Sequence, residues 1–214
     1  MVRRGFLSSY TGIIILINVI FFLLFLLLSY YFSEESAVSW IALQPATVLA
    51  GKNLWTFLTS MFMHAGLTHL FVNMISLMFI GNFVERLIGK KRFLGLYFGS
   101  GLFAGIFFVL IALVSGTDLN VYAVGASGAI FGLGGLLAVL TPRLPVLVFF
   151  IIPMPMWAAM GFLLVVLWAL SLGLGLPIGN VAHLGGLLVG VGYGFYLKNK
   201  YPRRTKIIRS YFSR

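Results

Sequence analysis

The sequence predicts an all-α membrane protein, a bundle of six transmembrane helices with both termini in the cytoplasm. Three observations predict this class: 61% of the 214 residues are hydrophobic, only 9% are charged, and long apolar runs follow one another along the chain. A water-soluble domain carries roughly a quarter charged residues, so a soluble globular protein is excluded. The sequence contains no cysteine, which excludes disulfide frameworks and cysteine-ligated metal sites.

Six segments are assigned as spans, since a helix that crosses the bilayer needs about 20 predominantly apolar residues. They cover about residues 11–32, 54–82, 93–114, 125–141, 156–173 and 181–197. The stretch 144–155 is too short to cross and is broken by prolines, so we expect a loop in the membrane interface. The resulting organisation is an N-terminus at residues 1–10, a membrane domain at 11–197 and a basic tail at 198–214.

The basic residues predict the orientation of the bundle. With these spans, 14 of the 15 Lys and Arg residues fall on one side of the membrane and only Lys52 on the other. Cytoplasmic loops carry the excess of Lys and Arg, so both termini are predicted to be cytoplasmic, in a multi-pass protein of the plasma membrane. Topology thereby accounts for the net charge of +11, and no nucleic-acid partner is predicted. The tail can in addition attract anionic lipid headgroups.

Among the polar side chains inside the apolar segments, five are singled out: His64, His69, Asn73, Ser127 and His183. Strongly polar groups inside a membrane span are costly and usually functional. The predicted topology places all five in one layer below the external surface, on three different helices. His69 and Asn73 are four residues apart and therefore stack on one helix face.

Glycines surround two of these polar residues. Ser127 lies in the string Gly125-Ala126-Ser127-Gly128, and three glycines follow His183 at four-residue intervals: Gly186, Gly190 and Gly194. Small residues at this spacing let membrane helices approach closely. We therefore expect the fourth and sixth spans to pack backbone to backbone, with Ser127 within reach of His183.

A serine beside a histidine is suited to nucleophilic catalysis. The hydroxyl is a weak nucleophile until a base takes its proton, and imidazole is the usual base near neutral pH. No carboxylate lies at this depth, so the sequence predicts a Ser–His dyad. Donors for a developing oxyanion could be the Ser127 backbone N–H, free in a first helical turn, and the side chains of His69 and Asn73. Phe131, one turn after Ser127, could orient the imidazole.

Each residue also has a simpler explanation. Glycine-rich strings in membrane helices usually serve packing, and His69 with Asn73 could be interhelical hydrogen-bonding groups. His183 could be a buried structural histidine. No histidine pair has the His-Glu-x-x-His spacing of a zinc site, and we predict neither metal nor cofactor. A transporter would need a polar path through the inner halves of the spans, which the sequence lacks. The coincidence of five polar groups at one depth favours catalysis.

Together these motifs resemble the rhomboid family of intramembrane serine proteases, over essentially all six spans. The resemblance rests on His64-x4-His69-x3-Asn73, Gly125-Ala126-Ser127-Gly128 and Ala182-His183 with its spaced glycines. It implies that Ser127 is the nucleophile, His183 the general base, and His69, Asn73 and the Ser127 amide the oxyanion hole. His64, Gly125, Gly128 and Phe131 would support the site, and Glu85 would be a structural tether.

The resemblance further implies an endopeptidase that cleaves transmembrane segments of other membrane proteins near the outer face, through an acyl-enzyme. A non-catalytic relative that binds transmembrane clients is the alternative, although such relatives typically lack the serine or the histidine. The chain departs from the family in two places. No tryptophan is followed by arginine in the first external loop, and Phe131 stands where the family often has tyrosine.

Overall fold

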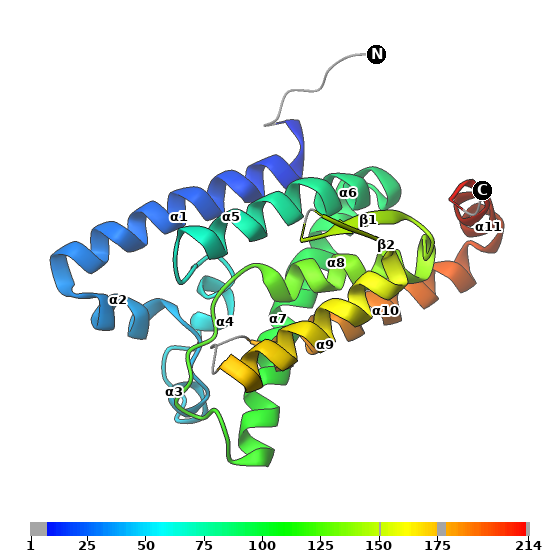
Figure 1. Ribbon diagram of the computed structural model, residues 1–214. Coiled ribbons are helices and arrows are strands. Elements are labelled where there is room, and N and C mark those ends of the chain that lie inside the picture. The colour runs from blue at the N-terminus through cyan, green and yellow to red at the C-terminus, as the bar shows by residue number, and fades with distance from the viewer. Residues whose placement is uncertain (1–7, 150, 175–178, 213–214) are drawn as a thin grey trace.

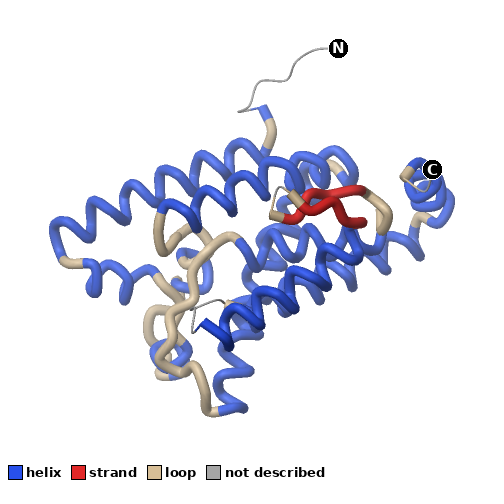
Figure 2. Tube along the Cα trace, viewed as in Figure 1, coloured by secondary structure: helices blue, strands red, loops and turns tan. Residues whose placement is uncertain are grey.

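Helices dominate the computed structural model, which describes residues 8–149, 151–174 and 179–212 (Figures 1 and 2). Four of the described helices are long and apolar enough to cross a membrane: α1 (Tyr10–Phe32), the continuous helix Leu67–Ile88, α7 (Lys90–Ser115) and α9 (Met156–Leu174). A shorter apolar helix, α8 (Ser127–Leu140), and the helix α10 (Asn180–Lys200) complete the bundle. The protein is therefore a helical, multi-pass membrane protein.

The second long helix begins later than the sequence predicted. It consists of α5 (Leu67–Ser76), a π-helical turn η2 (Leu77–Gly81) and α6 (Asn82–Ile88). Residues 54–66, assigned above to the span, instead form turns and the short helix α4 (Thr56–Thr59). Their apolar side chains Met61, Phe62 and Met63 are buried inside the protein. Hydropathy alone does not distinguish burial in a protein core from contact with lipid, which explains the error.

The segment after α1 forms two short helices, α2 (Glu34–Ile41) and α3 (Pro45–Leu49), and is fastened without a Trp-Arg pair. The indole nitrogen of Trp55 donates to the Trp40 carbonyl at 2.9 Å, and the Thr59 hydroxyl donates to the Ile41 carbonyl at 2.8 Å. Further along, Leu43 pairs with Ala123 as an isolated antiparallel bridge. The two side-chain bonds tie the end of α2 to residues 55–59, and the bridge ties this segment to the loop that leads into α8.

The stretch expected as a loop in the membrane interface contains a β-hairpin. Strands β1 (Pro145–Val148) and β2 (Ile152–Pro155) pair antiparallel and are red in Figure 2. A two-stranded hairpin has two free edges, and strand prolines are tolerated at edges because their missing N–H groups can face outward. The prolines therefore disfavour a helix in this stretch but are compatible with edge strands.

Helix α8 lies at the centre of the bundle, packed against α7, α9 and α10 (Figure 1). All of its residues from Gly128 to Leu137 are buried. A Cβ atom on Gly186 would overlap the Gly128 carbonyl, and one on Gly190 would overlap the Gly132 carbonyl. Helices α8 and α10 thus pack backbone to backbone, as the glycine spacing predicted.

Glu85 ties α6 to the start of α1. Its buried carboxylate accepts hydrogen bonds from the backbone N–H of Tyr10 at 3.1 Å, from that of Thr11 at 2.8 Å, and from the Thr11 hydroxyl at 2.8 Å. The first N–H groups of a helix have no intrahelical acceptor, so the carboxylate caps α1. Glu85 is a tether, although it lies inside the second long helix and holds a helix rather than a loop.

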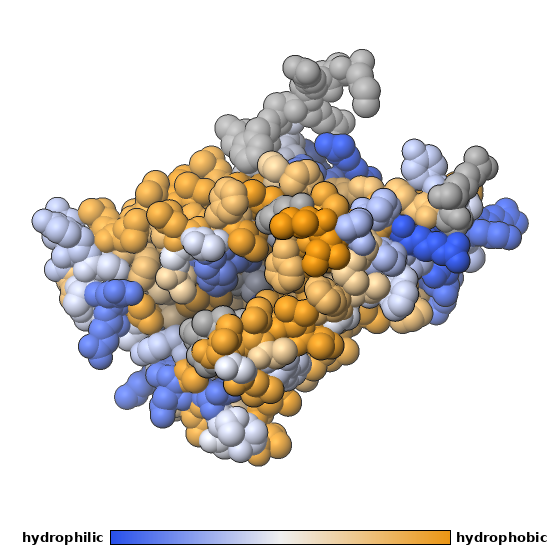
Figure 3. Space-filling model, viewed as in Figure 1, coloured by the Kyte–Doolittle hydropathy of each residue, from blue (hydrophilic) through white to orange (hydrophobic). Residues whose placement is uncertain are grey.

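Apolar side chains cover most of the surface seen in Figure 3, and hydrophilic residues gather toward its ends. Leu172 on α9 is 82% exposed and Leu23 on α1 is 59% exposed. Exposed apolar surface of this extent marks contact with lipid or a partner. The predicted tail continues α10 for one turn and then forms a further helix, α11 (Pro202–Tyr211).

Candidate active site

The first turns of α8 and α10 bring Ser127 and His183 together. Ser127 is the first residue of α8, and His183 is the fourth residue of α10. The two helices start at the same end of the bundle, and their glycine contact lets the side chains meet. His183 Nε2 lies 2.7 Å from Ser127 Oγ, which is hydrogen-bond distance.

The protonation of His183 follows from its contacts. If Ser127 Oγ donates to Nε2, the neutral ring carries its proton on Nδ1. Nδ1 is buried and has no hydrogen-bond partner among the described residues. Among the described residues, no carboxylate therefore lies in hydrogen-bond contact with the imidazole of His183.

Phe131 orients the imidazole of His183. It lies one turn after Ser127 on α8, and its ring stacks on that of His183 with centroids 4.5 Å apart and planes 13° apart. Parallel stacking restricts rotation of the imidazole and keeps Nε2 facing Ser127. The phenylalanine supplies this contact without the hydroxyl that the family often has.

Gly125 brings His69 close to Ser127. Its φ of +116° is one that residues with a side chain rarely adopt. A Cβ there would lie 2.9 Å from both Cε1 and Nε2 of His69, and 3.7 Å from Ser127 Oγ. The absence of a side chain at Gly125 is thus what lets the imidazole edge of His69 lie against the loop that carries Ser127.

The tautomer of His69 is assigned from a backbone contact. The Ala65 N–H donates to His69 Nδ1 at 3.4 Å. An Nδ1 that accepts leaves the proton of the neutral ring on Nε2, on the edge that faces Gly125. His69 therefore presents an N–H donor toward the Ser127 loop.

Asn73 and His64 flank His69 differently. Asn73 is buried one turn further along α5, where its Nδ2 donates to the His69 carbonyl at 2.8 Å. His64 lies in the turn before α5 and not inside a span, and its ring meets that of His69 edge-on with centroids 5.1 Å apart. It is 0% exposed. His64 thus packs against the ring of His69.

Gly128 sets the spacing of α8 from its neighbours. A Cβ at Gly128 would lie 2.7 Å from the Ala104 Cβ of α7 and 3.7 Å from the Ala182 carbonyl of α10. The glycine therefore allows three helices to converge directly behind Ser127.

Two residues of the site carried no signal in the sequence. Ala65 contributes its N–H to His69, and Ser60 contributes the carbonyl that accepts from the Gly125 N–H at 2.8 Å. Both act through the backbone, which any residue provides. Within the described residues, no group of three or more His, Cys, Asp and Glu side chains could hold a metal ion.

Comparison with known proteins places the chain in a family. A rhomboid domain matches residues 51–200. The chain is 31% identical over 150 residues to the yeast (Saccharomyces cerevisiae) Rhomboid protein 1, mitochondrial, an overlap of 69% of this chain and 43% of that protein. It is 29% identical over 187 residues to the Rhomboid protease GluP of Bacillus subtilis, covering 85% of this chain and 33% of that protein.

A third relative is Inactive RHOMBOID-like protein 8 of Arabidopsis thaliana, 36% identical over 98 residues, which cover 46% of this chain and 25% of that protein. The chain spans less than half the length of these relatives. The domain match takes in every candidate site residue, from His64 to His183. The chain belongs to the rhomboid family.

Proposed function

We propose that this protein is an intramembrane serine endopeptidase that cleaves transmembrane segments of other membrane proteins near the outer face. The observation that carries the proposal is the 2.7 Å contact between Ser127 Oγ and His183 Nε2. A serine that only filled space would not need an imidazole nitrogen aimed at its hydroxyl.

The reaction follows from these atoms. His183 Nε2 takes the proton of Ser127 as Oγ attacks the substrate carbonyl, and a tetrahedral intermediate forms. His183 then passes the proton to the leaving amine, which leaves an acyl-enzyme. Water, deprotonated by the same nitrogen, hydrolyses the ester and restores Ser127.

The oxyanion requires donors placed beforehand, each worth about 3–4 kcal/mol in comparable enzymes. The Ser127 N–H has no acceptor within its own helix, and His69 Nε2–H faces the same loop. Asn73 is the third proposed donor. Its Nδ2 carries two hydrogens, of which one is directed at the His69 carbonyl.

The length of α8 supports a site below the membrane surface. Its 14 residues span about 21 Å at 1.5 Å per residue, whereas the hydrocarbon core is about 30 Å thick. With Arg143, just past the end of α8, at the inner headgroups, Ser127 lies roughly 10 Å inside the opposite surface. The excess of basic residues at that inner end supports six spans with cytoplasmic termini. The plasma membrane is the proposed location.

Substrate and water both have to reach Ser127. Ser127 and His69 are only half-buried, so the hydroxyl and its neighbouring donor are open on one side. A helical substrate must unwind locally to expose a carbonyl, since its backbone groups are paired. We propose entry between α5 and α9. Cross-linking these helices should abolish cleavage of membrane substrates, and undiminished turnover would contradict this route.

A non-catalytic protein that binds transmembrane clients is the second candidate, because one relative is named inactive. The Ser127–His183 contact favours the enzyme, since client binding does not require it.

The deciding experiment incubates the purified protein with a panel of single-span substrates in lipid, beside the variants Ser127→Ala and His183→Ala. We expect cleavage by the wild type and a loss of about 10³-fold or more in both variants. Binding of a substrate without cleavage by the wild type would favour the second candidate.

A further inference from the structure

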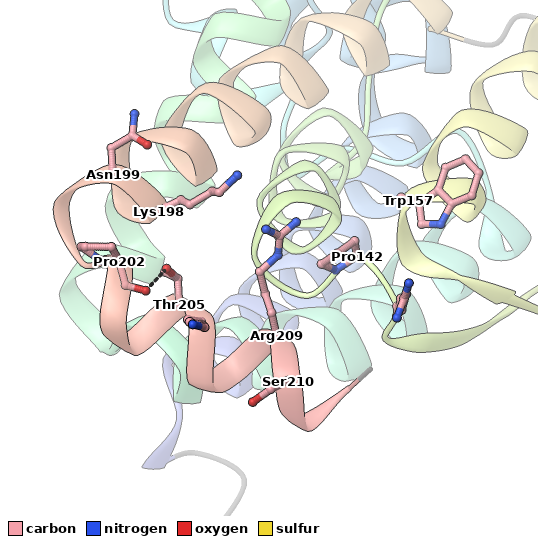
Figure 4. Close-up of a pocket in the computed structure, with 10 residues that line it drawn as sticks. Pro142, Trp157, Lys198, Asn199, Pro202, Thr205, Arg209 and Ser210 are labelled. Atoms are coloured by element: carbon pink, nitrogen blue, oxygen red, sulfur yellow. Dashed lines mark hydrogen bonds between the residues drawn. The ribbon is translucent and has the colours of Figure 1, made fainter. Parts of the chain in front are cut away.

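A basic pocket lies at the end of the bundle opposite Ser127. It has a volume of about 790 Å³ and is formed where α8, α9 and α10 meet α11 (Figure 4). Pro142 follows the end of α8, Trp157 is the second residue of α9, and Thr205 lies on α11. Ligand pockets in proteins have volumes of about 300–1,000 Å³, so the space is large enough for a phospholipid headgroup.

The charged side chains that line this pocket are all basic. Four of its ten lining residues are basic: Arg143, Lys198, Lys206 and Arg209. None of the four acidic residues of the chain lines it. Lys198 and Arg209 are half-buried, and their charged ends extend into the gap between α10, α11 and Pro142 (Figure 4). Like charges that lie close together without a counter-charge repel one another, so the lining favours an anion as ligand.

Apolar surface adjoins the charged pocket. Trp157 on its rim is 61% exposed, and tryptophan is enriched at membrane–water interfaces. On the neighbouring hairpin, Leu147 is 60% and Ile152 is 43% exposed. Beyond Trp157, Val165 of α9 is 69% exposed. A ligand that fits has a negative head and long apolar chains.

We propose that this pocket binds the phosphate headgroup of an anionic phospholipid, with its acyl chains along α9 and the hairpin. Arg143, Lys198, Lys206 and Arg209 contact the phosphate, and Trp157 marks the level of the headgroups. Basic pockets between membrane helices at a cytoplasmic face bind such headgroups in other proteins. The site is separate from Ser127 and does not depend on proteolysis.

The test uses the full-length protein in detergent. Bound lipid is counted by native mass spectrometry during titration with dioctanoyl phosphatidylglycerol, with dioctanoyl phosphatidylcholine and inorganic phosphate as separate arms. The pocket variant is Lys198→Gln/Arg209→Gln. The matched control, Arg203→Gln/Arg204→Gln, removes the same charge from exposed residues of α11 that do not line the pocket.

We expect one tightly held phosphatidylglycerol, whose Kd rises about tenfold or more in the pocket variant and less than about threefold in the control. An equal rise in Kd in both variants would mean that the lipid is held by diffuse electrostatic attraction to the basic tail, and would overturn the proposal. Equal binding of phosphatidylcholine, or displacement by low-millimolar inorganic phosphate, would also overturn it, the latter in favour of a free phosphate site.

A second measurement does not depend on the variants folding. Phosphatidylglycerol with a photoreactive headgroup is cross-linked to the wild-type protein in liposomes and the labelled peptides are identified. Labelling concentrated in residues 142–157 and 198–210 supports the proposal. Labelling spread over all basic segments contradicts it.

Discussion

Replacing Gly125 by alanine should disable the site without touching Ser127 or His183. The added Cβ would lie 2.9 Å from Cε1 and Nε2 of His69, whereas ordinary contact begins at 3.4 Å. The imidazole therefore has to move by a few tenths of an ångström or more. In addition, φ of +116° is strained for alanine, at a cost of about 1–3 kcal/mol.

The expected loss of activity follows from the role proposed for His69. Removing one oxyanion donor lowers kcat by roughly 10²–10³-fold, and Gly125→Ala should reach the lower end of this range. The assay is the initial rate of cleavage of a saturating single-span substrate in liposomes. Gly116→Ala is the matched control, because Gly116 also has positive φ (+69°) but nothing within 4 Å of its added Cβ. That variant should keep activity within about threefold.

A double-mutant cycle tests whether Gly125 acts through His69. If it does, His69→Ala with Gly125→Ala should be about as slow as His69→Ala alone, because the displaced group is already gone. Additive losses would refute this reasoning, as would a Gly125→Ala enzyme with nearly wild-type kcat.

Three further outcomes are expected. Phe131→Ala should lower kcat by about tenfold, because the His183 ring is then free to rotate. Phe131→Tyr should keep kcat near the wild-type value. An equal loss of kcat in both variants would contradict the stacking role. Gly186→Ala should destabilise the bundle by about 3 kcal/mol or more, which a lowered Tm would show. Gly192→Ala is the control, because its added Cβ meets open space, and its Tm should not fall. Similar Tm values for the two variants would be evidence against backbone contact of α8 and α10. Glu85→Ala should lower the free energy of unfolding by about 3 kcal/mol, since three hydrogen bonds to a buried carboxylate disappear. Glu85→Gln should lower it less. An unchanged Tm in Glu85→Ala would exclude the tether.

Helices with uniform apolar composition were predictable almost to the residue. The expected span 11–32 is α1 (Tyr10–Phe32), and 156–173 is α9 (Met156–Leu174). Glycine spacing predicted the contact of α8 with α10, because only residues without side chains permit such an approach. Prediction failed where apolar residues face protein instead of lipid, as at Met61 to Met63.

Some residues of the candidate site were predictable from the sequence and others were not. Side chains whose polarity is anomalous inside an apolar segment, such as Ser127 and His183, stand out in the sequence. The Ala65 N–H and the Ser60 carbonyl do not, because every residue offers the same backbone groups. His64 was misplaced for a different reason: its helix begins at Leu67, three residues later, and no strong capping side chain marks that start.

The most direct measurement is covalent labelling with a fluorophosphonate probe, read out by peptide mass spectrometry. The proposed dyad requires a single adduct on Ser127 in the wild type, no adduct in Ser127→Ala, and much slower labelling in His183→Ala. Equal labelling of the wild type and Ser127→Ala, or an adduct on another residue alone, would contradict the assignment of Ser127 as the nucleophile.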